Sequence, residues 1–137
     1  MKTTTSRQEG IVLIESLVAI LVFSVGILGI VGLLAASIRS NADARYRNDA
    51  SMLANQVIGQ MWAGDKSNAA LKANFESPGG PEYASWKTTV AGALPGVASN
   101  APTIGVSDDN VATVRVQWQA PGDAVPHSYV LVARING

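Results

Sequence analysis

Hydrophobic positions change their spacing twice along this chain of 137 residues. In residues 11–36 nearly every position is apolar, and the only polar side chains are those of Glu15, Ser16 and Ser24. In residues 46–61 the apolar residues recur at helical spacing, and in residues 103–135 they alternate with polar ones. This order predicts an apolar helix, an amphipathic continuation of that helix, and then a β-sheet.

The first two patterns join into one predicted helix. As an α-helix, residues 11–36 would cover roughly 39 Å, which is enough to cross the hydrocarbon core of a bilayer. No proline interrupts residues 11–63, and Gly64 stands where a helix C-cap is expected. The apolar stripe of the second half consists of Tyr46, Ala50, Leu53, Ala54, Val57 and Met61. A stripe on one side of a helix predicts that this half packs on a sheet.

Turn-forming residues separate two shorter helices from the long one. Ser67 is expected to cap a helix over residues 68–75, and residues 77–80 form a break rich in proline and glycine. Pro81 suits the first position of the next helix, which Pro95-Gly96 ends. The apolar residues at helical spacing in this segment are Tyr83, Trp86, Val90 and Leu94. We interpret Trp86 as a core anchor of this helix rather than as a platform for a ligand.

The C-terminal third predicts strands, because its period changes to two. Alternation is clear in residues 112–118 and 129–135, and the turn-forming segment from Pro121 to Pro126 between them predicts an antiparallel hairpin. A weaker strand is expected over residues 103–106. The predicted fold class is therefore α+β, with the long N-terminal helix packed on an antiparallel sheet of three or more strands.

Glu15 is the unusual residue of the apolar segment. An ionised group in hydrocarbon costs at least about 3 kcal/mol, and such residues usually face a partner rather than lipid. A secretory signal peptide explains the segment poorly, because its apolar core would run about 7 to 15 residues. A plain membrane anchor would not explain Glu15, unless the side chain reaches back to the membrane interface. The favoured interpretation is that Glu15 pairs with a positive group.

The N-terminal motif resembles the class III signal of type IV prepilins. A short basic leader ends in Gly10, a bulky apolar residue, Ile11, follows it, and Glu15 is the fifth residue beyond the glycine. Within that group, the runs over residues 13–21 and 24–30 are similar to minor pilins of the PilV type. The resemblance covers about the first 40 residues. Two departures are Ile11, where Phe is commoner, and the absence of the C-terminal cysteine pair of many major pilins.

The resemblance implies a processing step and a division of the chain. Prepilin peptidase would cut after Gly10 and methylate the new amino group of Ile11. Residues 1–10 would be the leader, residues 11–36 a transmembrane and filament-core helix, and residues 37–137 a periplasmic globular domain with the type IV pilin fold. Glu15 would then pair with the new N-terminus of a neighbouring subunit, so that two costly charges are neutralised when subunits dock.

The resemblance also implies a function and a location. A minor pilin is a structural subunit that helps to start pilus assembly at or near the tip, and it supports twitching motility and adhesion. Its partners would be other minor pilins, the major pilin and a large tip adhesin of the PilY type. The protein would sit in the bacterial inner membrane with its N-terminus in the cytoplasm, before entering the pilus. The alternatives are a minor pseudopilin of a type II secretion system, similar to GspI, and an unrelated membrane-anchored enzyme or binding protein.

Three glycines recur every third residue in the apolar helix, at Gly26, Gly29 and Gly32. Small residues let helices approach closely in apolar surroundings. Glycine also weakens a helix by about 1 kcal/mol relative to alanine, which allows local unwinding when the subunit moves into a fibre. Glycine is in any case common in membrane helices, so neither role follows from the spacing alone.

Composition and charge predict neither an enzyme nor a cofactor. Basic and acidic residues number 10 each, which indicates no nucleic-acid partner, and the chain has no cysteine. The single histidine, His127, cannot be matched with a nucleophile and is interpreted as an exposed or edge residue. Asp108-Asp109-Asn110 lacks further carboxylates at calcium-binding intervals and is interpreted as a turn. We therefore expect no catalytic residue, metal, cofactor or small-molecule substrate.

Overall fold

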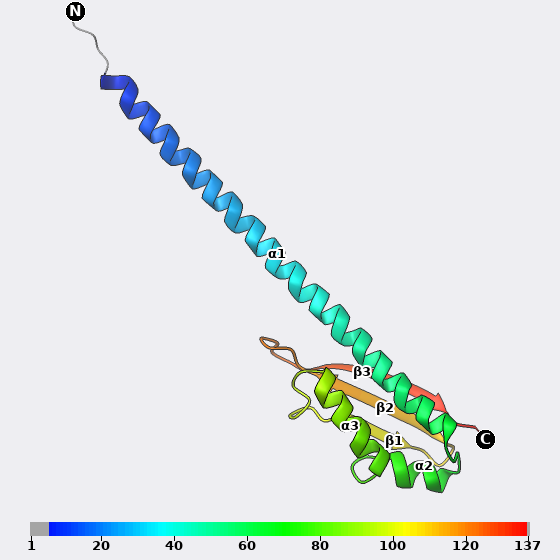
Figure 1. Ribbon diagram of the computed structural model, residues 1–137. Coiled ribbons are helices and arrows are strands. Elements are labelled where there is room, and N and C mark those ends of the chain that lie inside the picture. Colours follow the sequence, from blue (N-terminus) through cyan, green and yellow to red (C-terminus); the bar gives the residue numbers. More distant parts are fainter. Residues whose placement is uncertain (1–5, 137) are drawn as a thin grey trace, which may run out of the picture. The chain divides into compact units, whose positions relative to one another are not determined.

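The computed structural model describes residues 6–136, with side chains from Gly10 onward. Its elements are α1 (Ser6–Ala63), α2 (Asn68–Phe75), α3 (Pro81–Ala93), β1 (Thr103–Val106), β2 (Val111–Trp118) and β3 (His127–Arg134) (Figure 1). The chain divides into an N-terminal unit that ends at Asn41 and a C-terminal unit that begins at Ala42. The predicted α+β class is confirmed, with a long N-terminal helix and a three-stranded antiparallel sheet.

Helix α1 begins earlier than the sequence predicted. It starts at Ser6 rather than at residue 11, because no proline separates the end of the predicted leader from the apolar run. Residues 1–5 of that leader, with Lys2, lie outside the described residues. At the other end α1 stops at Ala63, as predicted, and the Gly64 amide donates to the Gln60 carbonyl at 3.1 Å.

In the N-terminal unit, α1 exposes its large apolar side chains on every side. Those of residues 11–38 are between 44% and 75% exposed. The two serines of this stretch satisfy their hydroxyls inside the helix: Ser16 donates to the Val12 carbonyl at 2.8 Å and Ser24 to the Ile20 carbonyl at 2.7 Å. By length and composition, α1 is able to cross a membrane.

In the C-terminal unit, α1 buries the predicted stripe. Ala50, Leu53, Ala54, Val57 and Met61 are all buried, and Tyr46 packs at the edge of the same core. Trp86 of α3 is 3% exposed, and its indole Nε1 donates to the Leu53 carbonyl at 2.9 Å. The interpretation of Trp86 as a core anchor is thus confirmed, because its ring fills the core while its polar atom is satisfied.

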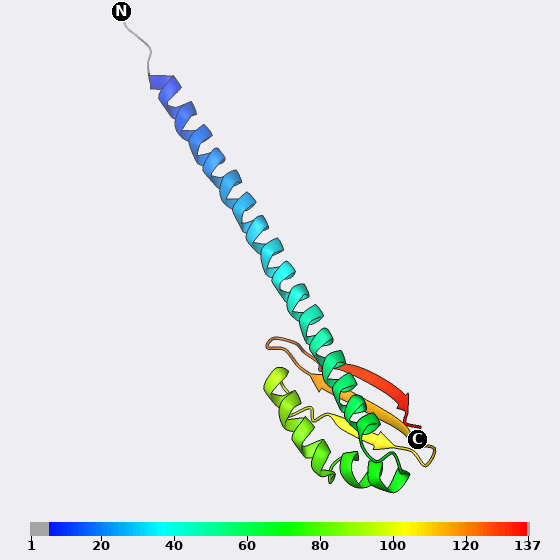
Figure 2. The ribbon, with the colours of Figure 1, turned by 45° about the vertical axis from the view of Figure 1, so that its right-hand side comes forward.

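The sheet is an antiparallel meander in the order β1-β2-β3. Alternate residues of β2 are buried, namely Ala112, Val114, Val116 and Trp118, while Thr113 and Arg115 face outward. Strand β3 follows the same alternation with partly buried residues on its inner face. Figures 1 and 2 show α2, α3 and the last turns of α1 beside one face of the sheet. The C-terminal unit therefore has two layers around one core.

The two short helices begin where the sequence predicted. The Ser67 side chain accepts a hydrogen bond from the Ala70 amide at the start of α2, and Pro81 occupies the first turn of α3. Helix α3 ends at Ala93 with Leu94 as its C-cap, and Gly96 then adopts a left-handed φ of 71°. A Cβ at Gly96 would meet the Gln119 carbonyl oxygen at 2.8 Å, so only glycine fits there without a shift.

Candidate functional site

The residues of the predicted processing and assembly site lie together near the start of α1. Gly10 and Ile11 are exposed on consecutive positions, with Ile11 66% exposed, and Glu15 follows little more than one turn later. Around Glu15 the neighbouring helix surface is formed by exposed apolar side chains such as those of Val12, Leu13 and Ile14. The helix therefore presents one carboxylate within an apolar surface.

Glu15 differs from the two serines of the same helix in how it can be satisfied. The serine hydroxyls donate to carbonyls one turn earlier, whereas an ionised carboxylate can only accept hydrogen bonds. Inside an α-helix the backbone amides already donate to carbonyls four residues before them. No side chain in residues 10–136 forms an ion pair with Glu15. Pairing of Glu15 with a positive group from another subunit stays a prediction.

The three glycines of α1 lie in an unbroken stretch of helix. A Cβ added at Gly26, Gly29 or Gly32 would meet nothing within 4 Å. The glycines are thus not required by any contact within the described residues. Close packing against a neighbouring helix and local unwinding in a fibre both stay predictions for the assembled state.

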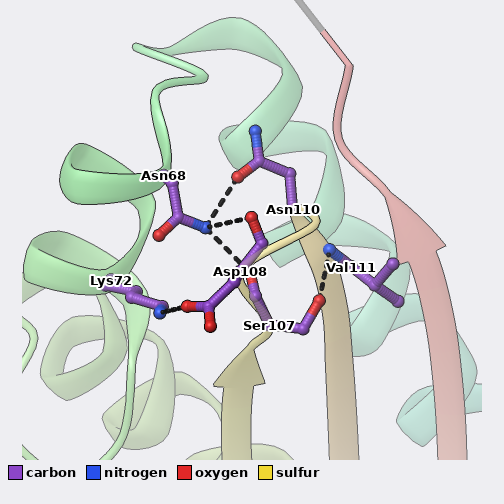
Figure 3. A network of polar contacts seen from close by, with 6 residues as sticks. All are labelled: Asn68, Lys72, Ser107, Asp108, Asn110 and Val111. Carbon is purple, nitrogen blue, oxygen red and sulfur yellow. Dashed lines mark hydrogen bonds and ion pairs between the residues drawn. The ribbon is translucent and has the colours of Figure 1, made fainter.

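The Asp108-Asp109-Asn110 segment forms the turn between β1 and β2, as the sequence predicted. Asn110 adopts a left-handed φ of 56°. The Asn68 side-chain amide donates to Asn110 Oδ1 and to the Ser107 carbonyl, both at 2.8 Å, as Figure 3 shows. The oxygens of this turn are thus used to dock it against α2, and the arrangement is a structural one.

An ion pair strengthens the same turn. Lys72 of α2 donates from Nζ to Asp108 Oδ1 at 2.6 Å (Figure 3). The hydrogen bond from Lys72, together with its charge, lowers the pKa of Asp108. The hydrogen bond to Asp108 raises the pKa of Lys72 in turn. The Asp108 side chain is 96% exposed and that of Lys72 is 33% exposed, so water screens the pair and it contributes little to stability.

His127 lies at the start of the edge strand β3, as predicted, but it does not stand alone. Its ring stacks on Trp118 with centroids 5.7 Å apart and planes 20° apart. Its Nε2 is 3.2 Å from Asp123 Oδ2, and the Asp43 carboxylate of α1 completes a group whose donor atoms all lie within 4.8 Å of one another. Sequence analysis missed this group, because only the four-residue spacing of Asp123 and His127 hints at it and Asp43 lies far away in the chain.

The resemblance to prepilins rests on the sequence motif of the N-terminal segment. Comparisons with models of protein families, with curated proteins and with solved structures found no match. The class III signal pattern therefore stands on residues 7–15 and on the runs that follow it. The structure adds a helix able to cross a membrane and an α+β C-terminal unit.

Proposed function

We propose that this chain is a minor pilin of the type IV pilus, a structural subunit that helps to start pilus assembly at or near the tip. The observation that carries the proposal is Glu15, a single carboxylate within an exposed apolar helix surface, five residues after Gly10. An ordinary membrane anchor has no need of such a charge, which is costly in hydrocarbon. A subunit that must recognise another subunit inside the membrane has a use for it.

The proposed mechanism begins with processing. Prepilin peptidase cuts after Gly10 at the cytoplasmic side of the inner membrane and methylates the amino group of Ile11. Cleavage creates an ammonium at the edge of the apolar segment. Glu15 of one subunit then pairs with the ammonium of its neighbour, and each neutralises a charge that is expensive to keep in lipid. The pairing thereby favours the one alignment of neighbouring helices that places Glu15 beside the N-terminal ammonium.

The exposed apolar side chains support the same sequence of events. Residues 11–38 need an apolar environment, which lipid supplies before assembly and neighbouring pilin helices supply afterwards. The partners are then other minor pilins, the major pilin and a large tip adhesin of the PilY type. In this role the C-terminal unit lies in the periplasm before assembly and on the cell surface afterwards, where the pilus supports twitching motility and adhesion.

The leader assignment is tested by replacing Gly10 with leucine. A large side chain beside the scissile bond should block the peptidase, so uncut precursor accumulates in the inner membrane. Intact mass measurement of the membrane-extracted protein distinguishes precursor from mature chain, and Gly10→Ala serves as the matched small substitution. Equal amounts of mature protein in Gly10→Leu and wild type would contradict the assignment.

The charge-pairing step is tested by Glu15→Leu. This change should permit insertion and cleavage but lower recovery of the chain in sheared pili by roughly tenfold or more, because the partner ammonium is left uncompensated. Glu15→Asp keeps the charge and should retain more incorporation. Quantitative immunoblotting of pili and membranes measures both. Normal incorporation of Glu15→Leu would refute the pairing mechanism, and recovery of the wild-type chain only with secretion pseudopilins would move the assignment to a type II secretion system.

A further inference from the structure

Asp43, Asp123 and His127 form a cluster of metal-ligating side chains in the C-terminal unit. They come from three places in the fold: α1, the connection between β2 and β3, and the first residue of β3. Each offers one ligand atom, and the three atoms lie within 4.8 Å of one another. We refer to these residues as the Asp43 cluster.

Two of the three side chains are held in place before any ligand binds. The His127 ring stacks on Trp118, which is 1% exposed and pairs directly with His127 across β2 and β3. The Asp123 amide donates to the Ala120 carbonyl at 3.1 Å, and the Asp123 carbonyl accepts from Gln119 Nε2 at 2.9 Å. These contacts fix the loop that carries the carboxylate, so the imidazole and one carboxylate are preorganised.

The separations between the donor atoms can be compared with those in a zinc site. In a tetrahedral zinc site with ligand bonds of about 2.0 to 2.1 Å, donor atoms lie about 3.3 Å apart. Nε2 of His127 and Oδ2 of Asp123 are 3.2 Å apart, which is a hydrogen-bond distance close to that spacing. A metal ion would replace this hydrogen bond and bind the imidazole in its neutral form. The Asp43 carboxylate is exposed at the surface of α1, and its ligand atom lies within 4.8 Å of those of Asp123 and His127.

The charges of the cluster favour a cation. It brings two carboxylates close together, and the ion pairs formed within residues 10–136 give neither of them a lysine or arginine partner. Among those ion pairs, the only partner of the Asp123 carboxylate is His127. Like charges at this separation repel each other, and a divalent ion placed between them would reverse the sign of that interaction.

We propose that the Asp43 cluster binds a divalent first-row transition-metal ion, for which Zn²⁺ is the fitting probe. One imidazole nitrogen with two carboxylate oxygens suits such ions better than Mg²⁺ or Ca²⁺, which prefer oxygen ligands throughout. Three protein ligands leave a fourth position for water or for a group from another molecule. A bound ion joins α1 to the β2–β3 connection, two segments otherwise distant in the chain. This inference does not rest on the proposed pilin function.

The test is a titration of the full chain in detergent with Zn²⁺, followed by calorimetry. We expect one ion per chain and a higher thermal unfolding midpoint in its presence, because the ion binds the folded state alone. Asp43→Asn should raise the dissociation constant by at least about tenfold, since even outer-shell partners of metal sites cost that much. Asp43 is exposed on a helix, so this variant keeps its fold. Asp109→Asn, a change at an exposed acid outside the cluster, is the matched control.

A second variant and a spectroscopic signal make the outcome decisive. His127→Gln should weaken Zn²⁺ binding at least as much as Asp43→Asn, and far-ultraviolet circular dichroism verifies its fold. Co²⁺ in place of Zn²⁺ should give visible absorption bands that disappear in His127→Gln. The proposal is overturned by the absence of Zn²⁺ binding to the wild-type chain, or by unchanged binding in Asp43→Asn and His127→Gln.

Discussion

Helix α1 carries the same kinds of apolar side chain in two opposite surroundings. In the N-terminal unit Leu28 is 70% exposed, whereas Leu53 in the C-terminal unit is 2% exposed. The difference follows from the pattern around each residue. Apolar residues surround the helix on all sides before residue 38, but they form one stripe with polar residues opposite in residues 46–61.

The contrast shows where each part of the helix finds its stabilisation. The C-terminal stripe is buried by α2, α3 and the sheet of its own unit. The side chains of residues 11–38 have no such cover within the described residues. Burying one large aliphatic side chain contributes about 1.5 to 3 kcal/mol. The stripe of residues 46–61 gains that contribution when the C-terminal unit folds. The side chains of residues 11–38 gain it only from lipid or from other molecules.

The largest expected difference in the free energy of unfolding is between the same leucine-to-alanine change at two positions of α1. Leu53→Ala should lower the free energy of unfolding of the C-terminal unit by about 2 to 5 kcal/mol, because it leaves a cavity in a packed core. Leu28→Ala should leave that free energy unchanged. Denaturant unfolding in detergent measures both, and tryptophan fluorescence reports on the correct unit because Trp62, Trp86 and Trp118 all follow Ala42. Equal destabilisation by the two changes would break the comparison.

A smaller effect compares a glycine from each unit. Gly96→Ala should destabilise the C-terminal unit by about 1 to 3 kcal/mol, because it forces a side chain into a left-handed conformation against Gln119. Gly29→Ala should instead favour the helix by up to about 1 kcal/mol, since its Cβ meets nothing. Thermal unfolding of the first variant and hydrogen exchange of α1 in the second measure these effects. A thermal unfolding midpoint of Gly96→Ala equal to or above that of wild type would contradict the first expectation.

The smallest expected effect concerns the exposed pair of Lys72 and Asp108. Its hydrogen bond lowers the pKa of Asp108 below the ordinary value of 3.8. The pair therefore adds stability above that value and loses it as the pH falls through the lowered pKa. Asp108→Asn should reduce the unfolding midpoint slightly at neutral pH, and the difference from wild type should shrink as the pH falls through the lowered pKa of Asp108 and its carboxyl becomes uncharged. A difference between wild type and variant that grows toward acid pH would reverse the assigned sign.

Local patterns in the sequence sufficed for most of the fold. The stripe of residues 46–61 and the alternation in β2 are periodic, and a period reports directly which face of an element is buried. Ser67 and Pro81 mark helix starts because their effects act within one turn. The sequence predicted that α1 starts at residue 11, whereas the helix begins at Ser6. No proline lies between Ser6 and Gly10 to stop the helix there.

The sequence by itself determined the motif of Gly10, Ile11 and Glu15, because those residues lie close together on one helix and their meaning depends on neighbours in the chain. Only the tertiary structure decided that Asp43 meets Asp123 and His127. No period or spacing links α1 to the β2–β3 connection. Their contact arises because the helix and the sheet bury their apolar faces together, which brings the polar residues at the rim of that core within reach of one another.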